Sequence, residues 1–300
     1  MNQPLLDFVT QSLLPTWNVS GVDASRGCFW ERLDESLQPI QLGYERLVTQ
    51  ARLIFTFSEG ALLGADQSLS EKALSAFRFM CANYWDAEKG GWRFSLGEGG
   101  SFPSGTRDLY AHGFVLLACA SLYRATKHTE ALEWAVRTFE FIHTHFRHPE
   151  IGFVSVLDSD NKPFEYPLLQ NPHMHLFEGI LFLNECSPDA RYAACAEEIL
   201  DLLLQRMLDC NTGTLTEYFD SRWIPDAHSG HRLEPGHHFE WVWLIHRWLR
   251  TAPAAARIAR EKSLLAAAST LMKWAVEKGL DLEQGGIFDE VDRDGHVLKD

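Results

Sequence analysis

Residues 152–156 read Gly-Phe-Val-Ser-Val, and a polar turn, Asp158-Ser-Asp-Asn161, follows two residues later. A glycine, then β-favouring residues, then turn residues is the pattern of a small hairpin or an extended excursion. Five such segments recur about every sixty residues, which indicates repeated supersecondary units. The other four begin at Gly27, Gly91, Gly213 and Gly286.

Between successive hairpins there is room for two helices, and the apolar patterns supply them. The first helix of each pair is apolar nearly all round, as in residues 114–120, which predicts a buried helix. The second carries charges on one side, as in residues 194–204, which predicts an outer layer. Inner and outer helices alternating around a circle describe an all-α fold, an (α/α)6 barrel or toroid with short β-hairpin excursions. The predicted helices cover residues 3–15, 44–60, 68–85, 107–125, 130–146, 173–187, 190–209, 236–250 and 255–279.

We interpret residues 1–300 as one toroid domain that lacks its last helices. Closing a ring of six helix pairs takes more helices than the sequence supplies before Asp300. We therefore expect the gene product to continue beyond this residue.

The composition narrows the classes of function. The formal net charge of −14 argues against a nucleic-acid or anionic-membrane surface. The hydrophobic content of 46% and aromatic content of 12% favour an extensive core and a pocket with aromatic walls. No segment resembles a signal peptide or a bilayer-spanning run. The scattered cysteines include no C-x-x-C pair, so we expect buried reduced thiols in a cytoplasmic protein.

Polar residues of the predicted inner helices gather at their N-terminal ends, just after the hairpins. In a toroid these ends converge on one mouth of the central cavity, where exposed helix N–H groups add positive potential. The residues are Arg46, Gln50, Arg52, Arg107, Asp108, Tyr110, His112, Asn171, His173, His175, His237 and Glu240.

The run from Glu234 to Trp241, Glu-Pro-Gly-His-His-Phe-Glu-Trp, is the most informative of these helix starts. His237 and Glu240 are three residues apart and share one helix face. A carboxylate beside an imidazole can orient it and tune its basicity, which suits proton transfer. The alternative is a histidine that only caps the helix start.

A second entry, Asn171-Pro-His-Met-His175, precedes another apolar run. His173 and His175 alternate, so we expect one to face the cavity and the other to bond a neighbour. Arg52 lies amid apolar residues and is either a ligand of the substrate or a buried ion-pair partner. Tyr110 and His112 are weaker candidates for substrate binding.

The histidine motifs do not complete a metal site. His173-x-His175 and His237-His238 offer imidazoles, but no H-E-x-x-H or comparable spacing completes a ligand set. The sequence also has no phosphate loop, no G-x-G-x-x-G after a strand and no G-x-S-x-G elbow. We expect neither a metal nor a cofactor.

Taken together, the motifs resemble the N-acylglucosamine 2-epimerase family, which includes bacterial mannose isomerases and sulfosugar isomerases. The Asn-Pro-His-Met-His and Glu-Pro-Gly-His-x-Phe-Glu-Trp strings carry most of the resemblance. The matching stretches follow the family's order over nearly the whole chain. They are residues 50–55, 108–114, 170–176, 234–241 and 285–290.

The resemblance implies an (α/α)6 barrel and proton transfer at carbon 2 of an opened aldose. By the resemblance, His237 is one proton-transfer residue. Glu240 would bind either His237 or a sugar hydroxyl. His175 would help to open the ring or steady the substrate. Arg52, Tyr110 and Asn171 would bind hydroxyls, with Arg52 on the enediolate oxygen. The family's second catalytic histidine would lie beyond Asp300.

The substrate expected from these arguments is a monosaccharide, with mannose giving fructose through a cis-enediol as the preferred reaction. Epimerisation of an N-acylglucosamine or another sugar at carbon 2 is the alternative on the same site. An inverting glycoside hydrolase, which needs two well-separated carboxylates, and a non-enzymatic helical scaffold are more distant alternatives. Nucleic acid and membrane partners are not expected, and a homodimer stays open.

Overall fold

The structure, a computed structural model, describes residues 3–97, 102–103 and 105–299. It forms two compact units. The first comprises Met1–Arg147 and Val156–Phe164, and the second comprises His148–Ser155 and Glu165–Asp300. No helix among the described residues is both long and apolar enough to cross a bilayer.

The first unit begins with a continuous helical segment of three parts and continues with two long helix pairs. Its helices are α1 (Gln3–Phe8), the π-helical η1 (Val9–Leu13), α2 (Leu14–Ser20), α3 (Leu47–Leu62), α4 (Ser68–Tyr84), α5 (Leu109–Thr126) and α6 (Thr129–His145). Its strands are β1 (Val22–Asp23), β2 (Cys28–Phe29), β3 (Tyr44–Arg46), β4 (Ser95–Gly97), β5 (Arg107–Asp108) and β6 (Val156–Leu157).

The second unit repeats the arrangement with two more helix pairs. Its helices are α7 (Gln170–Cys186), α8 (Ala190–Leu202), the π-helical η2 (Leu203–Met207), α9 (Pro235–Thr251) and α10 (Ala254–Lys278). Its strands are β7 (Leu168–Leu169), β8 (Tyr218–Phe219), β9 (Glu290–Val291) and β10 (Val297–Lys299).

Helix packing confirms the predicted pairs. In the first unit α3 packs on α4 and α5, and α5 packs on α6; in the second, α7 packs on α8 and α9, and α9 packs on α10. The helix α5 is buried almost all round, whereas α6 buries only one side. The predicted helix boundaries agree with the structure to within a few residues, except that the first helix runs on to Ser20.

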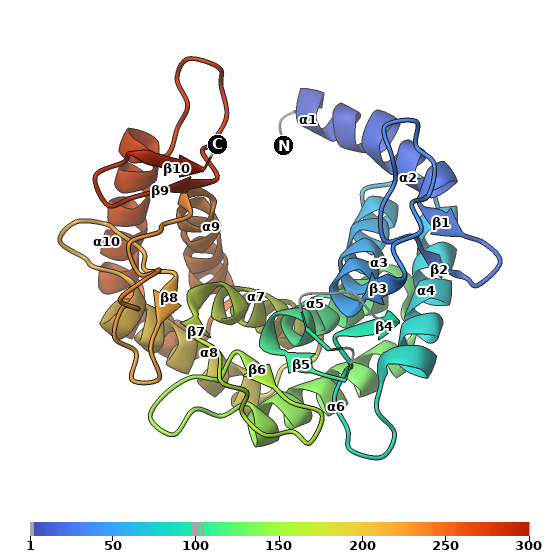
Figure 1. The fold of residues 1–300 in the computed structure, drawn as a ribbon, viewed down its shortest axis with the longest axis horizontal. Coiled ribbons are helices and arrows are strands. Elements are labelled where there is room, and N and C mark those ends of the chain that lie inside the picture. Colours follow the sequence, from blue (N-terminus) through green and yellow to red (C-terminus); the bar gives the residue numbers. More distant parts are fainter. Residues whose placement is uncertain (1–2, 98–101, 104, 300) are drawn as a thin grey trace. The chain divides into compact units, whose positions relative to one another are not determined.

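Short antiparallel strand pairs hold the start of each inner helix. The residue before α3, Arg46, pairs with Ser95, and Asp108 before α5 pairs with Val156. In the second unit Leu169 pairs with Tyr218, and Leu233 forms a bridge to Val291. Each pairing joins the N-terminus of an inner helix to the hairpin that follows its helix pair (Figure 1). Backbone hydrogen bonds therefore fix the direction in which the chain enters each inner helix.

The five glycines that define the repeat all have positive φ, from +71° at Gly27 to +115° at Gly286. Side chains on L-residues disfavour this region because Cβ crowds the backbone. At Gly91 a Cβ would also lie 2.4 Å from the Phe141 ring. The positive φ explains why glycine opens each hairpin, and at Gly91 the close approach of Phe141 excludes a side chain as well.

One side chain from each inner helix anchors the hairpin before it; we call Gln50, His112, His173 and His238 the hairpin-anchoring residues. Gln50 accepts from the Phe29 N–H at 3.0 Å. The Nε2 atoms of the three histidines accept from the N–H groups of residues 92, 153 and 215 at 3.0–3.2 Å. Each histidine Nδ1 lies 2.7–3.2 Å from the carbonyl oxygen four residues earlier. Such a ring must be neutral, with its proton on Nδ1.

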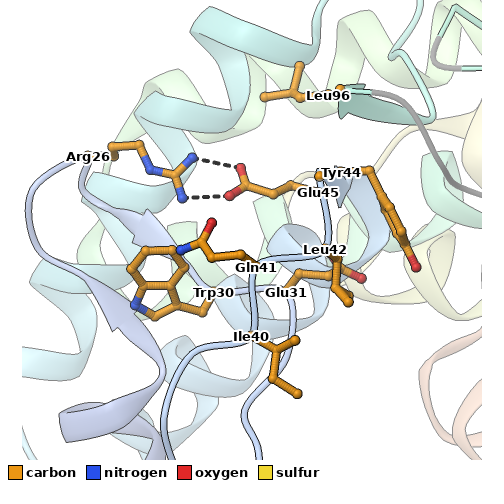
Figure 2. A pocket seen from close by; sticks show the side chains of 11 residues that line it. Arg26, Trp30, Glu31, Ile40, Gln41, Leu42, Tyr44, Glu45 and Leu96 are labelled. Atoms are coloured by element: carbon orange, nitrogen blue, oxygen red, sulfur yellow. Dashed lines mark hydrogen bonds and ion pairs between the residues drawn. The ribbon is translucent and has the colours of Figure 1, made fainter.

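An ion pair ties the first hairpin to β3. The Arg26 guanidinium makes a bidentate contact with the Glu45 carboxylate at 2.5 and 2.9 Å (Figure 2). These residues line a cavity of about 270 Å³ together with Trp30 and Gln41. Glu31, in the same wall, accepts from the Arg46 N–H at 2.8 Å, so the chain enters α3 from a fixed direction.

Candidate active site

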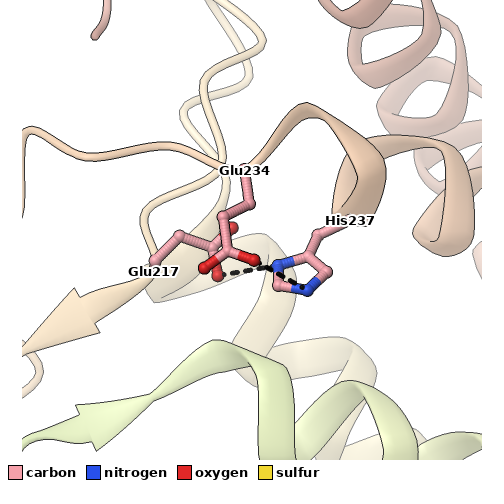
Figure 3. A group of neighbouring side chains, drawn as sticks. All are labelled: Glu217, Glu234 and His237. Carbon is pink, nitrogen blue, oxygen red and sulfur yellow. Dashed lines mark hydrogen bonds and ion pairs between the residues drawn. The ribbon is translucent and has the colours of Figure 1, made fainter. Parts of the chain in front are cut away.

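The centre of the site is His237, in the first turn of α9. Pro235 begins this helix, which suits its lack of an N–H donor and its fixed φ. The His237 side chain is 10% exposed, and a carboxylate lies at each of its ring nitrogens. Nδ1 is 3.0 Å from Glu217 Oε2, and Nε2 is 3.3 Å from Glu234 Oε2 (Figure 3).

Buried hydrogen bonds support Glu217 from behind. Its Oε2 also accepts from Gln170 Nε2 at 3.1 Å. The amide oxygen of Gln170 in turn accepts from Trp241 Nε1 at 2.6 Å. Glu217 is 2% exposed, and both Gln170 and Trp241 are fully buried. These groups come from α7, α9 and the residue before β8, all within the second unit.

The carboxylates decide the charge of His237. Burial alone would lower its pKa, but the charge and hydrogen bond of Glu217, with the charges of Glu234 and Glu240, raise the pKa to about 9. The imidazole is therefore mostly protonated at neutral pH. Burial raises the pKa of Glu234 to about 6, although the charge of His237 opposes this. His238, one residue on, differs: burial lowers its pKa to about 4, in keeping with its neutral anchoring role.

The expectation that Glu240 holds His237 is corrected by these contacts. Both nitrogens of His237 already have Glu217 and Glu234 as partners. Glu240 is one helical turn further on, where its Oε2 lies 3.8 Å from Nε2 of His175. A sugar hydroxyl remains the predicted partner of Glu240, whose side chain is 48% exposed.

The second histidine entry separates as predicted into one anchoring and one candidate residue. His173 anchors the Phe153 N–H, while His175 lies two residues on, with Nδ1 3.0 Å from Glu178 Oε2. His175 and Glu240 thus approach one another from the neighbouring helices α7 and α9. Asn171, in the same first turn as His173, has a buried Oδ1 with no hydrogen-bond partner among the described residues.

The remaining candidates lie in the first unit, on α3 and α5. Arg52 is exposed, and its guanidinium carbon lies 4.8 Å from the centre of the Phe114 ring. The Tyr110 ring is 5.0 Å from the same ring. The described residues give Arg52 no carboxylate partner, so the alternative of a buried ion pair is wrong. Arg52 and Tyr110 are therefore brought together around one phenylalanine.

His112 does not fit a substrate-binding role. It is fully buried, its Nε2 accepts from the Trp92 N–H, and its Nδ1 donates to the Asp108 carbonyl. Burial lowers its pKa to about 3. No ring nitrogen is left for a sugar hydroxyl, so we omit His112 from the proposed site. Its place in the repeat, equivalent to Gln50 and His238, explains why it is a histidine.

Glu217, Glu234 and His237 each place one donor atom within 4.8 Å of the others. A cation could suit that spacing, but a protonated imidazole between two carboxylates produces it as well. The raised pKa of His237 agrees with the second explanation. Asp292, Asp294 and His296 form a similar group around an exposed turn. The absence of a metal requirement stays a prediction.

Sequence reasoning missed Glu217, Gln170 and the role of Glu234. Glu217 ends the segment Gly213-Thr-Leu-Thr-Glu, which the repeat marked only as a hairpin. Its signal was a carboxylate amid β-favouring residues, next to the buried Leu215 and Phe219. Nothing local to the sequence indicates that this carboxylate meets a helix that begins some twenty residues later.

Paired helices, short strand pairs and a carboxylate-bound histidine at an inner helix start define a helical-repeat enzyme with acid/base groups. The chain belongs to the N-acylglucosamine 2-epimerase family (GlcNAc 2-epimerase), which it matches over residues 27–300. It is therefore an enzyme of the sugar isomerase and epimerase class.

Individual relatives agree with this assignment. The chain is 30% identical over 266 residues to a mannose-6-phosphate isomerase of Rhizobium meliloti, covering 87% of this chain and 67% of the relative. It is 26% identical over 314 residues to a cellobiose 2-epimerase of Bacteroides fragilis, covering 99% and 77%. A crystal structure of D-mannose isomerase has a TM-score of 0.85 at 20% identity, covering 99% and 76%. That likeness shows the fold, and the predicted α/α toroid class is confirmed.

Proposed function

We propose that the protein containing this chain interconverts an aldose and a ketose, with D-mannose and D-fructose as substrate and product. The observation that carries the proposal is His237, whose Nδ1 is fixed by the buried Glu217. General acid/base catalysis needs a titrating group held in one orientation, and an imidazole between carboxylates provides one. Relatives named mannose isomerase and mannose-6-phosphate isomerase support the aldose–ketose reaction.

In the proposed reaction a proton leaves carbon 2 of the opened sugar, and a cis-enediolate forms. Return of that proton to carbon 1 gives the ketose. His237 accepts that proton at Nε2 when its ring is neutral and then returns it. Resemblance to the family assigns Arg52 to the oxygen that becomes negative. His175 assists ring opening, with Glu178 on its Nδ1, and Asn171, Tyr110 and Glu240 bind hydroxyls.

Epimerisation at carbon 2 is the second candidate, because an enediolate is planar at that carbon. Return of the proton to the other face of carbon 2 inverts it instead of giving a ketose. Relatives named cellobiose 2-epimerase favour this alternative. Glu217 and Glu234 do not suit an inverting glycoside hydrolase, because one oxygen of each lies within 4.8 Å of the other, less than the 6.5–9.5 Å that inversion at a glycosidic bond uses.

Incubation of the whole protein with mannose in deuterated water tests the proposal. We expect fructose to form, with slower release of glucose by epimerisation. Replacing His237 with Ala should lower turnover by roughly 10²–10⁴, the usual contribution of one acid/base group. Hydrogen transfer that is unchanged in the His237→Ala protein would exclude the proton-transfer role. No product and no exchange with mannose, glucose, cellobiose or N-acetylglucosamine would reject the reaction class.

A further inference from the structure

The hydrogen bonds behind His237 have a fixed direction that starts at Trp241. An indole N–H can only donate, so the Gln170 atom 2.6 Å from it must be the amide oxygen. The Gln170 NH₂ group then points at Glu217 and donates to its Oε2 at 3.1 Å. Reversing this amide would place two donors face to face at Trp241 and two acceptors face to face at Glu217.

The same polarity continues to the imidazole. Glu217 Oε2 receives the Gln170 donor and also lies 3.0 Å from His237 Nδ1. An ionised carboxylate accepts only, and each ring nitrogen faces one. Glu217 is the closer and more buried of the two, at 3.0 Å from Nδ1 against 3.3 Å from Glu234 to Nε2, so the neutral ring keeps its hydrogen on Nδ1. Nε2 is then the nitrogen that gains and loses a proton. It lies on the side of the partly exposed Glu234 carboxylate, away from the buried groups.

We infer that Trp241, Gln170 and Glu217 form a positioning relay that fixes the tautomer of His237 and leaves Nε2 as its working nitrogen. None of the three needs to touch the sugar. Their burial supports the assignment, because a buried polar group without a hydrogen-bond partner is costly. Here each residue of the relay hydrogen-bonds to the next one. Glu217 Oε1 is the exception, with no hydrogen-bond partner among the described residues.

The charged surroundings of His237 do not replace this relay. Glu234 Oε2 lies 3.3 Å from Nε2, and Glu240 adds a further negative charge from the next turn. His238 is held neutral by its own backbone contacts. The negative groups favour a protonated ring. Which nitrogen keeps its hydrogen in the neutral ring is decided by Glu217, because its contact with Nδ1 is shorter and more buried than that of Glu234 with Nε2.

The test is a double-mutant cycle between Glu217→Gln and Trp241→Phe. A glutamine at 217 can either accept from Nδ1 or donate to it. With Trp241 present, the Gln170 NH₂ still points at residue 217 and forces its amide oxygen toward both donors, so the Nδ1–H tautomer persists. With phenylalanine at 241, the Gln170 amide is released, both amides can turn, and residue 217 can donate to Nδ1.

Nitrogen-15 NMR of labelled histidine reads the outcome without substrate. Spectra are recorded at a pH above the pKa of His237, where the neutral ring carries a single hydrogen. There we expect Nδ1–H in the wild type, in Trp241→Phe and in Glu217→Gln, and Nε2–H only in the double variant. Trp248→Phe is the matched control, since Trp248 is buried on the same helix and has no indole hydrogen bond among the described contacts. Glu217→Gln combined with Trp248→Phe should keep Nδ1–H. Circular dichroism confirms that each variant is folded.

The kinetic arm rests on the proposed function, whereas the NMR arm does not, so the two can fail separately. Trp241→Phe alone should lower kcat/KM by less than about tenfold, the scale of one buried hydrogen bond. The double variant should lose far more than the product of the single effects, toward the factor of about 10⁴ known for a wrong histidine tautomer in another enzyme class. Nε2–H in the wild type, or Nδ1–H in the double variant, would overturn the relay. Additive kinetic effects with the expected NMR result would instead reject the catalytic role of His237.

Discussion

Acid should destabilise the fold through the hairpin-anchoring histidines, and His112 provides the clearest case. Its ring is fully buried between two backbone groups, and both contacts require the neutral form. The pKa falls from 6.5 to about 3 because of burial. A depressed pKa on a base means that its stabilising contribution is complete above pH 6.5 and is lost as the pH falls toward 3.

The magnitude follows from these two pKa values. Between pH 8 and pH 5 the unfolded imidazole takes up a proton that the folded one does not, which lowers the free energy of unfolding by about 2 kcal/mol. The repeat suggests the replacement, since Gln50 binds the equivalent hairpin N–H without titrating. Between pH 8 and pH 5 the free energy of unfolding of His112→Gln should therefore fall by about 2 kcal/mol less than that of the wild type.

Urea unfolding at pH 8 and pH 5, followed by tryptophan fluorescence, measures the difference. Any general destabilisation by the replacement cancels, because only the change between the two pH values is compared within each protein. Replacing the exposed His228 with Gln is the control and should leave the pH dependence as in the wild type. An unaltered pH dependence in His112→Gln, at unchanged m values, would refute the assignment of His112 as a neutral buried anchor.

Three further outcomes are expected. Gly91→Ala should lower the free energy of unfolding in urea by more than Gly64→Ala does. Both glycines have φ near +78°, where a side chain costs about 1–2 kcal/mol, but of the two only Gly91 would bring a Cβ against the Phe141 ring. The pH profile of kcat/KM should show an inflection near pH 9 from His237. Glu234→Gln removes a negative charge beside the ring and should move this inflection to lower pH. An inflection that does not move would belong to another group. Dialysis against a chelator should leave activity intact, and loss restored by one divalent ion would contradict this.

Much of the fold was predictable because its signals are local. Glycines with positive φ recur with the repeat, and apolar periodicity marks the helices between them, so boundaries such as those of α4 and α6 agree closely with the structure. The separation of His173 from His175 was also foreseen, since neighbouring positions on a helix point in different directions. The repeat alone did not reveal that Gln50 and His112 do the same task, because their side chains differ.

The sequence by itself determined the helical repeat, the helix starts that carry polar residues, and the choice of His237 and His175 as candidates. Only the tertiary structure decided their partners. Glu217 reaches His237 from a separate hairpin, and Gln170 and Trp241 meet between two helices, so no local pattern encodes these contacts. Tertiary contacts also give the neighbouring histidines different charges. His238 is bound by backbone groups and is neutral, whereas His237 lies between carboxylates and holds a proton. The physical reason is that charge state depends on burial and on neighbours in space, which the order of residues along the chain does not fix.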